Sequence, residues 1–424
     1  MKTKMKRIRV DALRPGDIVL TARRTASGKG VRLSTAGTVS HAMICVQQGS
    51  IIDSTSDGVQ ARNVQREFFW PADQVHAFRL KEPLDEATLL RLVEYTRSQI
   101  GTRYSLREAA RSVTGGARPR GKRQFCSRLV ALAYAYIGIH LVADEDYCTP
   151  EELRRSPLLD QLEDPTETVS AEEVAFWRDR PDPIKRTHDS QTRILRVARK
   201  FDATIENFEG LPRLVRERPD ADAAIAEVLM SSGYLRIWDM ELKANPWRFD
   251  LEIMESLATP DRVGEVRDYC GTTIAEAYSG GHRFAVVLGA HRAEFQIWPR
   301  TSTALLIALY ERLVRDDQRR RETALRWLQR HFPDDAVKRL ERVEPHSALW
   351  FHYVDRVEPA LGEAARRAIA SEGALQVCSS CGDLPRDYRL INAADAMPGV
   401  PSLRLCDDCV AIRRAMGEAL VLLP

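Results

Sequence analysis

The sequence predicts an α+β protein whose 424 residues form several parts. Two strand-like runs precede an apolar helix-like run near the N-terminus, helical spacing dominates the middle, and four cysteines form two pairs near the C-terminus. These observations divide the chain into an α+β domain over residues 1–165, a linker over 166–190, a mainly helical domain over 191–372 and a small four-cysteine module over 373–424.

The first part contains a predicted hairpin that carries a histidine and an aspartate. His41 follows the small polar segment STAGTVS and precedes AMICV, a pattern typical of a short buried strand after a loop. In the next run, Asp53 follows the apolar residues Ile51 and Ile52, and the QQGS turn between the two runs suits two antiparallel strands. The hairpin would bring the two side chains together, so that the carboxylate orients the imidazole.

Cys126 opens the helix-like run QFCSRLVALAYAY. Six apolar residues recur after it at helical spacing: Leu129, Val130, Leu132, Ala133, Tyr136 and Ile137. A cysteine on the first turn of a helix and beside an imidazole has a lowered thiol pKa, and the thiolate is the nucleophile. The free backbone N–H groups of that turn would also hold an oxyanion.

Each of these residues also has a structural interpretation. A lone buried cysteine is usually a small hydrophobe, a lone histidine is usually a hydrogen-bonded polar group, and Asp53 would also suit a turn cap. Only the combination of His41, Asp53 and Cys126 indicates a Cys-His-Asp hydrolase.

Over roughly the first 160 residues, the chain resembles the circularly permuted, NlpC-type papain-like thiol hydrolases of the YiiX/YaeF-like group. The segments IGTRYS and QFCSRLV match the tyrosine and cysteine motifs, SHAMICV and IIDS match the histidine strand and the next polar position, and LRPGDIVLTA looks like the first strand. The histidine precedes the cysteine, as a permutation requires. The resemblance implies a permuted papain-like domain with Cys126 as nucleophile, His41 as base and Asp53 as the third polar residue.

Two further residues are candidates for contact with the substrate or its oxyanion. Tyr104 falls where the family places a tyrosine close to the nucleophile, although a core aromatic would fit equally well, and Ser127 follows the cysteine. Arg128 departs from the family, which usually has glycine there. A basic loop, TGGARPRGKR, also intervenes, and its cations either favour the thiolate and an anionic substrate or are simply solvated: Arg118, Arg120, Lys122 and Arg123.

The four C-terminal cysteines predict a zinc site. Two Cys-x-x-Cys pairs, separated by 24 residues, supply Cys378, Cys381, Cys406 and Cys409. Four thiolates close the coordination sphere of zinc, so the metal would be structural, and no cofactor is expected for catalysis. Disulfides are the disfavoured alternative, because the other four cysteines lack the spacing of a disulfide framework: Cys45, Cys126, Cys148 and Cys270.

The middle of the chain is predicted from composition and spacing. Prolines and charges in EDPTETVS and RDRPDPIKRTHD predict a linker. Apolar residues then recur at helical steps in TRILRVARKFDATIENF, AIAEVLMSSGYLRIWDMEL and STALLIALYERLVRDDQRRRETALRWLQRHF. The segment HRFAVVLGAHRAEFQIW is compatible with strands or with a buried helix.

Charge and hydropathy exclude several classes of protein. The 63 basic and 60 acidic residues leave a net charge of +3, and no nucleic-acid motif accompanies the local basic runs, so a nucleic-acid partner is not expected. No apolar run reaches the length of a membrane span, and nothing at the N-terminus resembles a secretory signal. These features favour a cytoplasmic protein.

The leading hypothesis is a cysteine hydrolase of the peptidase or amidase type, which cleaves a peptide, amide or acyl ester through an acyl-enzyme on Cys126. One alternative transfers the acyl group to an amine or lipid, as in the related lecithin retinol acyltransferase group. Another makes the N-terminal domain a scaffold and the zinc-bearing region a module that binds protein or nucleic acid. The helical and zinc regions would supply contacts to a protein partner or select the substrate.

Overall fold

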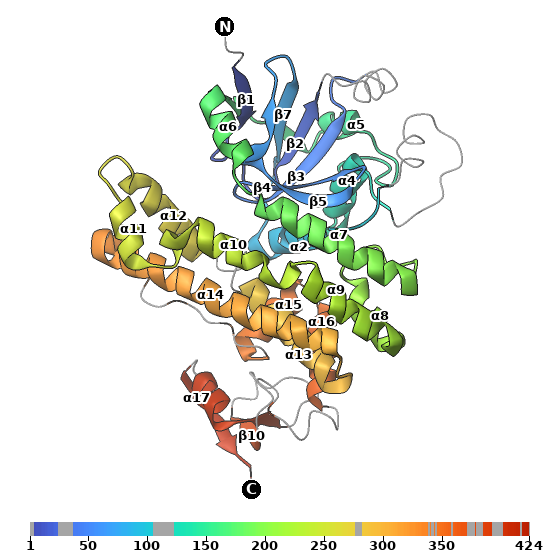
Figure 1. Ribbon diagram of the computed structural model, residues 1–424, viewed down its shortest axis with the longest axis vertical. Coiled ribbons are helices and arrows are strands. Elements are labelled where there is room, and N and C mark those ends of the chain that lie inside the picture. The colour runs from blue at the N-terminus through green and yellow to red at the C-terminus, as the bar shows by residue number, and fades with distance from the viewer. Residues whose placement is uncertain are drawn as a thin grey trace. The chain divides into compact units, whose positions relative to one another are not determined.

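The computed structural model separates into two compact units, Met1–Leu214 and Val215–Pro424 (Figure 1). The described residues are 4–23, 37–104, 123–275, 282–337, 340, 343, 346–357, 359–370, 378, 385–391, 402–415 and 418–423. The structure mixes helices and sheets, in agreement with the predicted α+β class.

The first unit is built around a six-stranded antiparallel sheet with the order β5-β4-β3-β2-β7-β8. Its strands are β2 (Ile18–Ala22), β3 (His41–Gln47), β4 (Ser50–Thr55), β5 (Gly58–Asn63), β7 (Gln74–Leu80) and β8 (Leu159–Gln161). The predicted hairpin is confirmed: β3 and β4 pair antiparallel, and Gly49 turns the chain between them with a φ of 75°.

The predicted helix of Cys126 is also confirmed, as α4 (Cys126–Tyr136). It packs together with α2 (Glu86–Ser98) and one face of the sheet. Leu129 and Val130 share a core with strand residues that include Ile44, and all three are fully buried. The Tyr134 hydroxyl donates to the Gly16 carbonyl at 2.5 Å, which fixes α4 against the loop before β2. A short helix, α5 (Pro150–Arg154), follows.

A second, three-stranded sheet joins the start of the chain to residues far along it. β1 (Met5–Ile8) lies between β6 (Phe68–Phe69) and β9 (Thr166–Val169), and both pairings are antiparallel. A 3-10 turn, η1 (Val64–Arg66), precedes β6.

The region predicted as a linker, 166–190, instead consists mostly of regular structure. It holds β9, α6 (Ala171–Asp179) and the first turns of α7 (Pro183–Phe201). Proline begins α7 rather than breaking it, because the first helical position needs no backbone N–H. The Arg199 side chain donates to the Gly101 carbonyl at 3.0 Å, and α7 belongs to the first compact unit.

The second unit is largely helical, as its apolar spacing predicts. Its helices are α9 (Asp222–Ser231), α10 (Ile237–Ala244), α11 (Leu251–Leu257), α12 (Val263–Ala275), α13 (Arg283–Ile297), α14 (Thr301–His331), α15 (Ala348–Val357) and α16 (Pro359–Ala370), while α8 (Gly210–Glu217) spans the division between the units. The ambiguous apolar segment is therefore the helix α13. Among the described residues, no helix is long and apolar enough to cross a membrane.

The C-terminal part combines a small sheet with one helix. The sheet order is β11-β10-β12, from β10 (Arg386–Leu390), β11 (Leu403–Leu405) and β12 (Leu420–Leu422), and α17 (Asp407–Ala415) follows β11. Buried Arg413 donates to Glu418 at 2.6 Å and to the His346 carbonyl at 2.8 Å, which attaches α17 to the residues just before α15.

Candidate active site

The hairpin brings His41 and Asp53 into contact. His41 is the first residue of β3, and its Nε2 lies 2.9 Å from Oδ2 of Asp53 in β4. Asp53 is 2% exposed, whereas the His41 side chain is 27% exposed. The segment before His41 is also anchored, because buried Glu151 accepts a hydrogen bond from the Thr38 backbone N–H at 2.9 Å. The Asp53 carboxylate is therefore enclosed, and the His41 imidazole remains accessible.

Cys126 completes the cluster from the first turn of α4. Its thiol hydrogen-bonds with His41, and the backbone N–H groups of Ala42 and Ser127 also point to it. Burial would raise the pKa of the Cys126 thiol, but the hydrogen bond and charge of His41, together with those N–H groups, lower it below its ordinary value. The arrangement therefore favours a thiolate.

The histidine carries the complementary charge. Burial would lower the pKa of His41, but hydrogen bonds with Asp53 and Cys126 outweigh it and raise the pKa to about 10. Because Nε2 contacts Asp53, Nδ1 is the ring nitrogen available to the thiol. The two shifts act in the same sense and favour an imidazolium beside a thiolate, which is the reactive form of a cysteine nucleophile.

Tyr104 and Ser127 occupy different positions around the thiol. Tyr104 forms an isolated bridge with Gln124, two residues before the cysteine. Burial and the nearby Cys126 raise the pKa of Tyr104, so its hydroxyl stays protonated and able to donate. The Ser127 hydroxyl instead donates to the Cys148 carbonyl at 2.8 Å. Ser127 therefore faces the thiol through its backbone N–H.

The two departures from the family pattern differ in outcome. Arg128 is 3% exposed, and its guanidinium lies 2.7 Å from a carboxylate oxygen of Asp146. This ion pair accommodates a large cationic side chain where glycine is usual. In the basic loop, only Arg123 is among the described residues; Arg118, Arg120 and Lys122 lie outside them.

Arg62 is a site residue that the sequence reasoning missed. Its Nε donates to both carboxylate oxygens of Asp53, at 3.0 and 2.9 Å, and its Nη1 lies 3.1 Å from Glu67. In the register of β4 and β5, Ile51 faces Arg62 and Asp53 faces Gln60. Arg62 on β5 is thus diagonally opposite Asp53 on β4. The SDG turn between the two strands is the sequence signal that suggests their pairing, and the pairing in turn brings these side chains together.

Three of the four predicted zinc ligands meet in the second unit. The thiols of Cys378, Cys406 and Cys409 lie within 4.8 Å of one another and are buried. Cys406 follows β11 and Cys409 lies on the first turn of α17. Tetrahedral zinc with bonds of about 2.3 Å holds its sulfur ligands roughly 4 Å apart, so the three thiols fit the metal. Cys381 lies outside the described residues.

Comparison with known proteins agrees with this geometry. Residues 12–148 match the family model described as permuted papain-like amidase enzyme, YaeF/YiiX, C92 family. The match spans His41, Asp53, Tyr104 and Cys126, and it confirms the resemblance predicted from the motifs. It covers less than half of the chain, and neither the helical region nor the cysteine module falls within it. No curated protein matches the sequence.

Proposed function

We propose that residues 12–148, which match the permuted papain-like amidases, cleave an amide bond through an acyl-enzyme on Cys126. The observation that carries the proposal is the position of His41, which hydrogen-bonds with both Asp53 and Cys126. Three unrelated features of the chain, a strand start, a neighbouring strand and a helix start, supply these side chains. Their convergence is what a thiol hydrolase needs.

The reaction begins with attack of the Cys126 thiolate on the amide carbonyl carbon. Backbone N–H groups at the first turn of α4 stabilise the oxyanion as the tetrahedral intermediate forms. The His41 imidazolium gives its proton to the leaving nitrogen, the C–N bond breaks, and the amine departs from a thioester. Neutral His41 then takes a proton from water, the hydroxide attacks the thioester, and the carboxylic acid and the thiolate are released.

Asp53 and Tyr104 have supporting roles in this mechanism. Asp53 accepts a hydrogen bond from His41 and stabilises the imidazolium, and its own orientation is held by Arg62. Tyr104 keeps its proton and lies close enough to Cys126 to sense its charge, so it donates a hydrogen bond to the substrate or its oxyanion.

The direct test measures hydrolysis of a panel of peptide amides and acyl esters. We expect Cys126→Ala and His41→Ala to reduce kcat/KM by about a thousandfold or more. Cys148→Ala is the matched control, because Cys148 is buried and its surroundings raise its thiol pKa, so this variant should retain activity. Equal activity in Cys126→Ala and the wild type would refute the proposal.

The same assay separates hydrolysis from acyl transfer. The thioester is open to water or to an amine, and the products differ. Adding a primary amine acceptor to the reaction and measuring the free acid and the new amide gives the partition between them. Mass spectrometry of a rapidly quenched reaction should detect one acyl group on the peptide that contains Cys126.

We also propose that the C-terminal cysteines bind one structural zinc ion. The thiols of Cys378, Cys406 and Cys409 support it, and Cys381 is the predicted fourth ligand. Four thiolates leave no position for water, so the metal stabilises the fold of this part and takes no part in hydrolysis. Cysteine ligands remain reduced in the cytoplasm, and we propose the cytoplasm as the location of the protein. We also propose that the helical and zinc regions supply contacts to a protein partner.

Metal analysis and proteolysis test the zinc site. We expect about one zinc per chain, and about none in Cys406→Ser. Removing the metal with a chelator should expose the segment around α17 to protease while labelling of Cys126 is unchanged. A metal-free protein whose C-terminal segment resists protease would contradict this proposal.

A further inference from the structure

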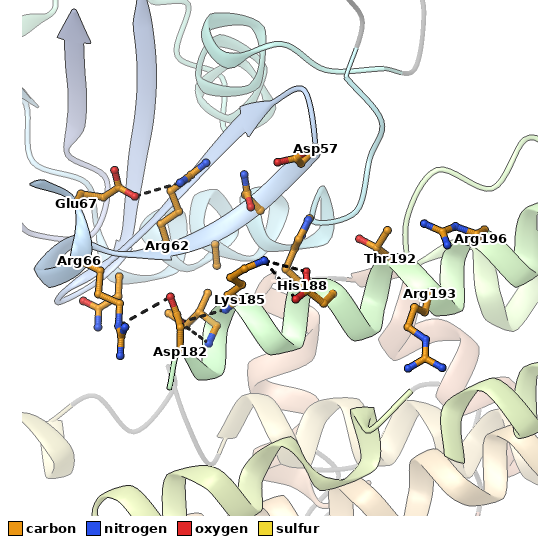
Figure 2. Close-up of a pocket in the computed structure, with 15 residues that line it drawn as sticks. Asp57, Arg62, Arg66, Glu67, Asp182, Lys185, His188, Thr192, Arg193 and Arg196 are labelled. Atoms are coloured by element: carbon orange, nitrogen blue, oxygen red, sulfur yellow. Dashed lines mark hydrogen bonds and ion pairs between the residues drawn. The ribbon is translucent and has the colours of Figure 1, made fainter. Parts of the chain in front are cut away.

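The first unit contains a cleft next to the carboxylate side of the catalytic cluster, which it meets at Arg62. Its volume is about 700 Å³, and Figure 2 shows its wall on α7 facing residues of β5 and η1. Volumes of this size hold small-molecule ligands. The lining of the cleft includes Asp57, Arg62 and Arg66 on one side and His188, Arg193 and Arg196 of α7 on the other.

The polar wall of this cleft follows from the amphipathic pattern of α7. Four residues recur at steps of three or four and line the cleft: Lys185, His188, Thr192 and Arg196. The opposite side of the helix is buried through Ser190, Ile194, Leu195 and Ala198. The helix is therefore fixed by its apolar side, and it holds the polar side chains in place.

The cations of the cleft near the start of α7 are paired with carboxylates, whereas two arginines farther along the helix, and the carboxylate of Asp57 opposite, have no ion pair among the described residues. Near the start of α7, the ion pairs Arg66–Asp182 and Lys185–Asp189 span 3.9 and 3.4 Å. Arg193 and Arg196 lie toward the other end of the helix (Figure 2). Among the described residues, no carboxylate lies within ion-pair distance of either one.

We propose that this cleft binds a small molecule with a carboxylate or phosphate group, and that Arg193 and Arg196 hold the negative group. Both arginines line the cleft from α7, and a guanidinium group offers paired N–H donors to the oxygens of either anion. Thr192 directly precedes Arg193, also lines the cleft and adds a hydroxyl donor. Burial lowers the pKa of His188, so this neighbour is neutral at pH 7 and offers a hydrogen bond.

Arg62 connects the cleft with the catalytic cluster. It lines the cleft and also donates to both oxygens of Asp53, which in turn contacts His41. An anion in the cleft offsets part of the positive potential that Arg62 contributes at Asp53 and beyond. Positive potential favours a thiolate, so occupancy should move the pH midpoint of Cys126 alkylation upward. The ligand thus acts on the nucleophile without touching it.

Calorimetric titration with citrate and with pyrophosphate, at constant ionic strength, tests the site and separates carboxylate from phosphate. We expect the Arg193→Ala/Arg196→Ala variant to bind the preferred probe about tenfold more weakly or worse. The matched control is Arg178→Ala/Lys200→Ala, which removes two exposed cations of the same unit that do not line the cleft. This control should bind like the wild type. Circular dichroism establishes that both variants are folded.

Several outcomes would overturn the inference. Neither probe binding to the wild type, or equal binding by the cleft variant, would remove the site. A bound probe that left the labelling midpoint of Cys126 unchanged would remove the connection through Arg62. Because binding is measured without substrate, a failure here is distinct from a failure of the proposed amidase reaction.

Discussion

Replacing His41 with alanine isolates what the histidine contributes to the acidity of the Cys126 thiol. In the wild type, the hydrogen bond and charge of His41 are the largest contributions that lower the Cys126 pKa below 9.0. Without them, burial opposes only the backbone N–H groups of Ala42 and Ser127. A thiol of ordinary pKa 9.0 is about 1% ionised at pH 7, and at that pH the ionised fraction falls about tenfold for each unit by which the thiol pKa rises. Alkylation at pH 7 should therefore be at least about tenfold slower in His41→Ala.

The assay is iodoacetamide labelling between pH 5 and pH 10, read for each cysteine by peptide mass spectrometry. His140→Ala is the matched control, because it removes an imidazole whose side chain is 69% exposed and which contacts Glu145 rather than Cys126. Cys148 serves as an internal reference, since burial raises its thiol pKa and should keep it unlabelled near neutral pH. Coincident profiles for the wild type and His41→Ala would refute the reasoning.

Three further predictions concern stability, measured by urea unfolding. Burial would raise the pKa of Glu151, but hydrogen bonds from arginine and from a backbone N–H lower it from 4.5 to about 2. Glu151→Gln should therefore lower the free energy of unfolding by about 3 kcal/mol at pH 7. Because the folded pKa is the lower one, this difference should persist above pH 4.5 and vanish as the pH falls toward 2; a constant difference would contradict it. Arg128→Ala should cost about 3 kcal/mol, because it removes the ion pair of a buried guanidinium with Asp146. A double-mutant cycle with Asp146→Ala should show a less than additive loss, and strictly additive losses would contradict a stabilising pair. Gly58→Ala should cost about 2 to 3 kcal/mol, because the φ of Gly58 is 96° and a new Cβ would lie 2.7 Å from a backbone carbonyl oxygen. The control Gly138→Ala should cost about 1 kcal/mol, because Gly138 has a φ of 85° but open space around it. Equal costs would contradict the close contact at Gly58.

The local features of the site could be predicted because short-range signals specify them. A polar loop, an apolar run and a QQGS turn suffice for the hairpin of His41 and Asp53, and apolar spacing suffices for the helix of Cys126. Their meeting in space required the resemblance to a known family, because no local pattern specifies contact between residues 41 and 126.

The missed features depend on longer-range or ambiguous signals. Proline favoured a linker near Pro183, but it begins α7, and only capping by Asp182 distinguishes the two cases. Arg62 contacts Asp53 through strand register, which depends on the pairing of β4 with β5. The helix α13 stayed ambiguous because its apolar residues are not confined to one face.

The pairing of β1 with β9 affects how the protein is synthesised and truncated. Met5 pairs with Val169, so one side of the first strand stays unpaired until the ribosome has made residues well beyond Cys126. A fragment that ends at residue 148, where the family match stops, exposes that strand edge and lacks the whole of α7. A fragment for expression of the first unit alone should therefore extend past α7 to the end of α8 at Glu217.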